Sequence, residues 1–211
     1  MAVIHPSIPF SFPGIAEDID RLKRLLAHSI SLMKWAAPLE PQVLNIACGR
    51  ADETGILLET LAAHRPRCQY LGLDLRQAEI QEARRRWGRP IFSETKQDLQ
   101  IEFRVADAAS ASALPEGEVF DCVFIRHQNY WDAPAVWDLI FHHARMRLKP
   151  QGLMIFTSYF DREHELAIAA HRSRGFPLLL DIPHAQSRAL TDAPGKSVDR
   201  RLAIFSHEFR G

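Results

Sequence analysis

The feature that most constrains the fold is a short, mostly apolar run that stops at a cluster of small residues. Residues 43–46 read Val-Leu-Asn-Ile, a composition typical of a strand buried in a parallel sheet. Small residues with Gly49 at their centre follow, and an apolar helical pattern begins after Asp52 and Thr54, which are candidate N-caps. Because a strand, a tight turn and a helix N-terminus bring backbone N–H groups together, this stretch predicts a ligand-binding turn.

Glycine spacing alone does not identify the ligand. The dinucleotide fingerprint G-x-G-x-x-G would need glycine at Ala47 and Asp52 as well as at Gly49. Two further apolar segments end in an acid, at Asp74 and at Asp107, and each is predicted to be a strand. The spacing of these strand ends indicates an α/β sheet, and a nucleotide- or NAD-binding Rossmann-like protein stays as one alternative.

Periodicity and chain breakers predict alternating strands and helices along the rest of the sequence. The predicted helices cover 15–35, 54–64, 77–87, 134–148 and 161–172. The predicted strands cover 42–46, 68–74, 103–108, 120–126, a segment that reaches 159, 177–182 and 201–209. No helix separates the last two strands, so we expect an antiparallel hairpin at the C-terminal end. Residues 88–99 form a polar insertion without an interpretable pattern.

Composition favours a single domain over 1–211, with an N-terminal segment and helix over 1–40 and the core over 41–211. The 26 basic and 26 acidic residues cancel, so no nucleic-acid or membrane partner is indicated. No apolar run reaches membrane-spanning length, and the N-terminus lacks the apolar region of a signal peptide. The three cysteines match no zinc spacing, so we expect a cytoplasmic protein without a metal site.

The order and spacing of these segments over residues 42–209 resemble the class I S-adenosylmethionine-dependent methyltransferases. This resemblance implies a three-layer Rossmann-like fold, with a seven-stranded, mostly parallel sheet and an antiparallel C-terminal hairpin strand. It also implies transfer of a methyl group from S-adenosyl-L-methionine to an oxygen, nitrogen or carbon nucleophile, with S-adenosyl-L-homocysteine as product. We expect a small-molecule substrate, because no separate substrate domain or basic stripe is visible.

In the resembling family the first turn carries an acid followed by G-x-G-x-G. Here Asn45 stands at the acid position, and Ala47, Gly49 and Ala51 stand at the glycine positions. The resemblance therefore implies that Asn45, Ala47, Cys48 and Gly49 contact the cofactor. Each alanine adds one methyl group, which the turn can accommodate if φ stays negative.

Two strand-end acids are further cofactor contacts by resemblance. Asp74, followed by Leu75, is expected to accept the ribose hydroxyls, and its loss is expected to leave the stability of the cofactor-free protein nearly unchanged. Asp107 is expected to accept the adenine amino group, and the N–H of Ala108 to meet an adenine ring nitrogen. The alternatives are a helix N-cap at Asp74 and a loop Asx-turn at Asp107.

The loop after the fourth predicted strand supplies the catalytic candidates. In the resembling family it lies beside the transferred methyl group, so Arg126 is expected to contact the cofactor and His127 to act as a general base. Tyr130, with Trp131, is expected to stack on the substrate or to shield the sulfonium. The alternatives are that His127 only hydrogen-bonds its loop, or that the chain is a non-catalytic relative that keeps the fold.

Overall fold

The computed structural model describes residues 14–63, 65–88, 98–114 and 116–207. Within these residues seven strands form one sheet in the order β3-β2-β1-β4-β5-β7-β6. The strands are β1 (Gln42–Ile46), β2 (Arg67–Asp74), β3 (Asp98–Val105), β4 (Phe120–Ile125), β5 (Leu148–Ser158), β6 (Leu178–Pro183) and β7 (Arg201–Phe205). The first five run parallel, whereas β7 is antiparallel to both β5 and β6. The predicted sheet and C-terminal hairpin are therefore confirmed.

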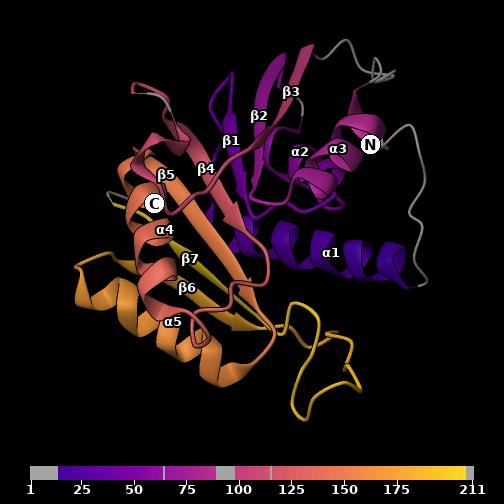
Figure 1. Cartoon of the computed structure of the whole chain (residues 1–211), viewed down its shortest axis with the longest axis vertical. Coiled ribbons are helices and arrows are strands. Elements are labelled where there is room, and N and C mark those ends of the chain that lie inside the picture. Colours follow the sequence, from indigo (N-terminus) through magenta and orange to yellow (C-terminus); the bar gives the residue numbers. More distant parts are fainter. Residues whose placement is uncertain (1–13, 64, 89–97, 115, 208–211) are drawn as a thin grey trace.

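Helices cover both faces of this sheet, which makes three layers (Figure 1). The helices are α1 (Ile15–Met33), α2 (Thr54–Leu61), α3 (Gln77–Trp87), α4 (Pro134–Met146) and α5 (Asp161–Ser173). The first three helices pack on one face, and α4 and α5 pack on the other. Because each parallel crossover returns to the same end of the sheet, the carboxyl ends of β1, β2 and β4 meet at one edge.

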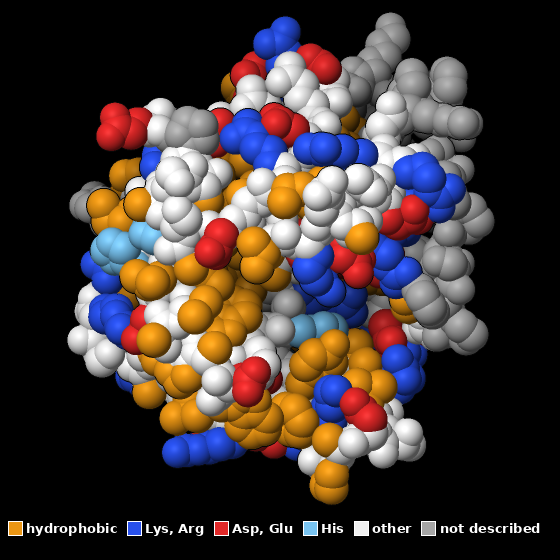
Figure 2. Space-filling model, in the orientation of Figure 1, with side chains coloured by type: hydrophobic (Ala, Val, Ile, Leu, Met, Phe, Trp, Pro, Cys, Tyr) orange, Lys and Arg blue, Asp and Glu red, His pale blue; other side chains and the backbone are white. Residues whose placement is uncertain are grey.

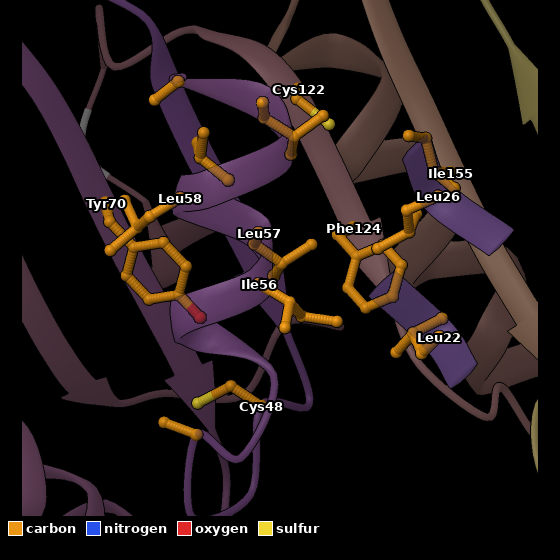
Figure 3. Close-up of a cluster of buried hydrophobic side chains, with 14 of the residues drawn as sticks. Leu22, Leu26, Cys48, Ile56, Leu57, Leu58, Tyr70, Cys122, Phe124 and Ile155 are labelled. Atoms are coloured by element: carbon orange, nitrogen blue, oxygen red, sulfur yellow. The ribbon is translucent and has the colours of Figure 1, made fainter. Parts of the chain in front are cut away.

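Fully buried aliphatic and aromatic side chains join the first three helices to the sheet (Figure 3). Leu22 and Leu26 of α1, Leu57 of α2 and Phe124 of β4 have no exposed surface and share one cluster. Their spacing along α1 follows the helical repeat, which places them on one side of that helix. Burying each such side chain contributes about 1.5–3 kcal/mol, so α1 belongs to the core of the fold.

The predicted boundaries agree well with the structure for the buried elements and less well for the edge strand β3. The helix at 77–87 and the strand at 120–125 lie where the pattern placed them. The third strand begins at Asp98, not at Phe103, so it includes two residues of the uninterpreted insertion. Exposed and partly buried residues alternate along this strand, which pairs with β2 on one side and lies at the edge of the described sheet. Residues 89–97, and 208–209 of the last predicted strand, lie outside the described residues.

His171 lies inside an aromatic cluster between α5 and the sheet. It is 3% exposed, and its ring centroid lies 4.3 Å from that of Phe141 and 4.6 Å from that of Phe205. Its Nε2 is buried without a hydrogen-bond partner among the described residues. Burial, with smaller contributions from Arg174 and Arg145, lowers the pKa of this imidazole from 6.5 to about 3.

This imidazole should make the fold sensitive to acid. Below pH 6.5 His171 is protonated in the unfolded chain but stays neutral in the folded one. The contribution of this group to the free energy of unfolding is therefore fully present above pH 6.5 and decreases as the pH falls towards 3. The expected loss at pH 5 is about 2 kcal/mol from this group. We expect His171→Phe to remove that loss in urea unfolding at pH 7 and pH 5, whereas the exposed His142→Phe should keep it. An unchanged pH dependence in His171→Phe would refute the assignment.

Candidate active site

A charged cavity of about 380 Å³ lies at the carboxyl ends of the central strands, and we call it the strand-end cavity. It is lined by Ala47, Cys48, Gly49, Arg50, Asp52, Glu53, Arg76, Glu79, Arg126 and His127. Figure 2 shows basic, acidic and histidine side chains gathered around a hollow near the centre of the face, close to where β4 ends in Figure 1. Loops after three parallel strands thus converge on one place, where open α/β sheets bind their ligands.

The turn after β1 forms one wall of the strand-end cavity in a left-handed conformation. Ala47, Gly49 and Ala51 have φ of 56°, 52° and 61°. The condition under which alanine would fit without strain, a negative φ, is therefore not met at either position. The chain keeps the backbone path that glycine would adopt freely, and each alanine stores strain of about 1–2 kcal/mol to do so.

Asp74 organises this turn from the end of β2. Its Oδ2 accepts the backbone N–H of Gly49 at 2.8 Å, and its Oδ1 accepts the N–H of Arg76 at 2.8 Å. The Arg76 guanidinium also donates to both carboxylate oxygens, at 3.0 and 3.1 Å. Burial raises the pKa of Asp74, but these hydrogen bonds outweigh it and the net pKa lies below the ordinary value. Because Asp74 is only 4% exposed and ties the turn to β2, its loss should destabilise the cofactor-free protein, contrary to the sequence-based expectation.

Asn45 is not among the residues that line the strand-end cavity, and its predicted contact with the cofactor stays a prediction. It is fully buried, and its Nδ2 donates to Glu53 Oε1 at 2.6 Å and to the Tyr70 hydroxyl at 2.9 Å. Glu53, which the sequence did not single out, is the N-terminal flanking residue of α2 and lines the strand-end cavity. The predicted side-chain caps from Asp52 and Thr54 are absent, since no side chain caps this helix.

A buried ion-pair network holds Arg126 and His127, which also line the cavity. Asp199, in the loop before β7, is 1% exposed and accepts hydrogen bonds from Arg126 at 2.7 and 3.1 Å and from the Thr157 hydroxyl at 2.8 Å. Arg126 and His127 hold the pKa of this carboxyl far below its usual range despite burial. The Asp199 Oδ1 also lies 2.9 Å from His127 Nε2. Asp199 therefore stays ionised and anchors both cavity residues that follow β4.

Contacts of both its backbone and its ring hold His127 in place. Its backbone N–H donates to Thr157 Oγ1 at 3.1 Å, its ring stacks on Tyr159 with centroids 3.8 Å apart, and its φ is 56°. The Asp199 N–H lies 3.2 Å from the same Nε2 that faces the Asp199 carboxylate. We assign the ring proton to Nε2 because the bond to the ionised carboxylate is shorter and charge-assisted. Burial holds the pKa of His127 below 6.5, although Asp199 opposes that shift.

The remaining predicted residues do not line the strand-end cavity. Tyr130 packs against α4, where its hydroxyl donates to Asp138 at 2.9 Å. Asp107 accepts the N–H of Ala109 at 2.9 Å, which is the Asx-turn alternative, and Ala108 lines a separate hollow beside α4. Leu75 is 67% exposed beyond the end of β2. The predicted roles of these four residues stay predictions.

No group of three or more His, Cys, Asp or Glu side chains in the described part of the chain is arranged to hold a metal ion. None of the helices described is both long enough and apolar enough to cross a membrane.

The strand order and the antiparallel β7 place the molecule with Rossmann-like methyltransferase folds. Solved structures of the same architecture include the N-methyltransferase NodS from Bradyrhizobium japonicum, at 17% identity and a TM-score of 0.61 over 90% of this chain and 97% of that one. A second NodS structure, in complex with S-adenosyl-L-homocysteine, is 18% identical with a TM-score of 0.59 over 89% and 86%. An S-adenosylmethionine-dependent methyltransferase from Clostridium acetobutylicum is 11% identical with a TM-score of 0.61 over 90% and 92%.

Sequence comparison then gives the family. Residues 43–152 match the family described as a methyltransferase domain, and the chain belongs to it. A comparison with curated protein sequences gives no match. Family membership confirms the resemblance to class I S-adenosylmethionine-dependent methyltransferases, the methyltransferase activity and S-adenosylmethionine as the cofactor.

Proposed function

We propose that this methyltransferase acts on a small-molecule nucleophile, with its cofactor in the strand-end cavity and His127 as the general base. The observation that carries the proposal is that the Gly49 turn lines the same cavity as His127, whose Nε2 lies against the buried Asp199 carboxylate. S-adenosylmethionine, when bound, supplies an electrophilic methyl group on a sulfonium. Displacement at such a carbon depends chiefly on alignment, so the residues that hold and deprotonate the acceptor complete the site.

The first wall fits a cofactor that carries a ribose. Gly49 leaves space above the turn, where an added Cβ would lie 3.5 Å from the Arg76 guanidinium. Asp74 offers a carboxylate for two hydroxyl groups, provided that Arg76 gives up its contacts. The Arg76 side chain is 63% exposed, so it is free to exchange its place for solvent. In this assignment Gly49, Cys48 and Asp74 hold the nucleoside end of the cofactor.

The second wall supplies the base. With its proton on Nε2, the His127 imidazole presents the Nδ1 lone pair, and its lowered pKa keeps that lone pair available at neutral pH. The proton of the acceptor moves to Nδ1 as the acceptor attacks, and Asp199 stabilises the imidazolium that results. Arg126 keeps Asp199 ionised, so it acts as a positioning residue for this pair.

A small acceptor is favoured over nucleic acid by where the basic side chains lie. Arg84, Arg85 and Arg86 form the most basic run in the sequence, yet each contacts the protein itself. Arg84 donates to the carbonyl of Phe103, Arg85 pairs with Glu82, and Arg86 is buried against Asp52. This run therefore offers little uncompensated charge for phosphates.

The test is an assay of S-adenosylhomocysteine formation from S-adenosylmethionine with separate panels of acceptors. One panel holds phenols, amines and carboxylic acids, and the others hold protein and RNA preparations, with an acceptor-free background. We expect turnover above background with at least one small-molecule class and none with RNA. Turnover confined to protein or RNA would contradict the small-molecule assignment.

A further inference from the structure

The inference concerns Glu53 and rests on the proposed position of the cofactor. Glu53 is 4% exposed yet lines the strand-end cavity. Its Oε1 accepts the Asn45 amide at 2.6 Å, whereas its Oε2 lies 3.8 Å from Arg126 Nη1, beyond hydrogen-bond distance. One carboxylate oxygen is thus held by a hydrogen bond, and the other makes only a long ion pair with Arg126 among the described residues.

Charge in and around the strand-end cavity is balanced on one side and unbalanced on the other. On the α3 side, three arginines lie against three carboxylates: Arg50, Arg76 and Arg86 with Asp52, Asp74 and Glu79. On the β4 side, Arg126 alone faces two carboxylates, Asp199 and Glu53. Arg126 donates hydrogen bonds to both carboxylate oxygens of Asp199, so its charge is largely committed there. Counted as formal charges, the carboxylates on this side therefore exceed the arginines by one.

The immediate surroundings favour a cation over a neutral group. Burial raises the pKa of Glu53, and Arg126 and the Asn45 hydrogen bond offset that rise only in part, so a further positive partner would favour the ionised carboxylate. Asn45 leaves its own Oδ1 buried without a partner among the described residues, because its amide nitrogen is directed at Glu53 and Tyr70. The amide thereby fixes the orientation of Glu53 without contributing charge.

We propose that Glu53 binds the α-ammonium group of the methionine portion of the cofactor. The family carries an acid at the position of Asn45, and in this chain the carboxylate lies eight residues further along, at Glu53. The residue gives specificity for the amino-acid end of the cofactor, while Asp74 at the end of β2 takes the ribose. S-adenosylhomocysteine keeps this ammonium and lacks the sulfonium, so it isolates the contact.

The test is calorimetry with S-adenosylhomocysteine and with its analogue that lacks the α-amino group. We expect wild type to bind the complete ligand about tenfold or more tightly than the analogue, and Glu53→Gln to abolish that difference. Glutamine can still accept the Asn45 hydrogen bond, and a melting curve of the cofactor-free variant checks its fold. Glu79→Gln is the matched control, because it removes a cavity carboxylate on the α3 side and should keep the difference.

Each outcome decides a separate point. If Glu53→Gln discriminates between the two ligands as well as wild type does, or if wild type does not discriminate, the Glu53 assignment is wrong while the cofactor site stands. Should Glu53→Gln be too unstable to assay, the wild-type ratio of the two affinities still decides, because a ratio near one overturns the proposal. If wild type binds neither ligand, the proposed cofactor position fails together with the inference.

Discussion

We expect His127→Asn to reduce methyl-transfer turnover by about 10²–10⁴-fold while the affinity for S-adenosylhomocysteine stays unchanged. Asparagine preserves a polar side chain in the left-handed position but cannot take a proton at neutral pH. The wild-type rate should be complete above pH 6.5 and should fall only as the pH drops through the lower pKa that burial gives His127. The variant should lack this acid limb.

His184→Asn is the matched control for that experiment. The His184 Nδ1 lies 3.0 Å from the Asp199 carbonyl oxygen, so it contacts the same loop as His127 without lining the strand-end cavity. We expect this control to keep the wild-type rate and its acid limb. If His127→Asn also keeps both, His127 only shapes its loop and the enzyme works by alignment alone.

Restoring the family's acid at the first turn, by Asn45→Asp, should destabilise the protein by about 3 kcal/mol at pH 7. The substitution replaces the amide that donates to Glu53 at 2.6 Å with a second carboxylate in a fully buried place. Two ionised carboxylates at that separation cannot both keep their charge, so one pKa of the pair must rise. A carboxyl whose pKa is raised in the folded state stabilises that state at low pH relative to neutral pH. This stabilisation is lost as the pH rises through the raised pKa. The deficit relative to wild type should therefore shrink from pH 7 towards pH 4.

The exchange variant Asn45→Asp with Glu53→Gln separates charge repulsion from a simple packing defect. Here the glutamine amide can donate to the new carboxylate, so one hydrogen bond and one negative charge are both retained. We expect urea unfolding at pH 7 to recover most of the lost stability in the double variant. Equal instability in the single and double variants would show that Asn45 is needed for its shape and not for its amide.

The sequence predicted the fold well because buried strands and helices carry their own pattern. The run at 120–125 is buried along its whole length, and Gly88 follows the end of α3. The edge strand β3 was placed five residues late, since Gln100 and Glu102 point to solvent and read as loop. Alternation of polar and apolar residues is typical of a solvent-exposed edge strand, but an ordinary surface segment can show a similar pattern.

The site was only partly predictable for a different reason. Gly49, Asp74 and His127 follow three parallel strands, so topology alone brings them to one edge. Asp199 lies 72 residues after His127 and reaches it because β7, which follows Asp199, runs antiparallel to β5. No local sequence pattern predicts such a long-range contact. The only sequence signal for Glu53 was indirect, namely the missing acid at Asn45.

The central claim is that S-adenosylmethionine binds at the Gly49 turn, and calorimetric titration of wild type and Asp74→Asn with S-adenosylhomocysteine tests it most directly. We expect saturable binding at one site per chain, and an affinity weakened by about tenfold or more in the variant, because asparagine lacks the charge that strengthens hydrogen bonds from ribose hydroxyls. Circular dichroism establishes that the variant is folded at the titration temperature, since Asp74 also holds the turn. No binding to wild type at millimolar ligand, or equal affinities in the two proteins, would contradict the account.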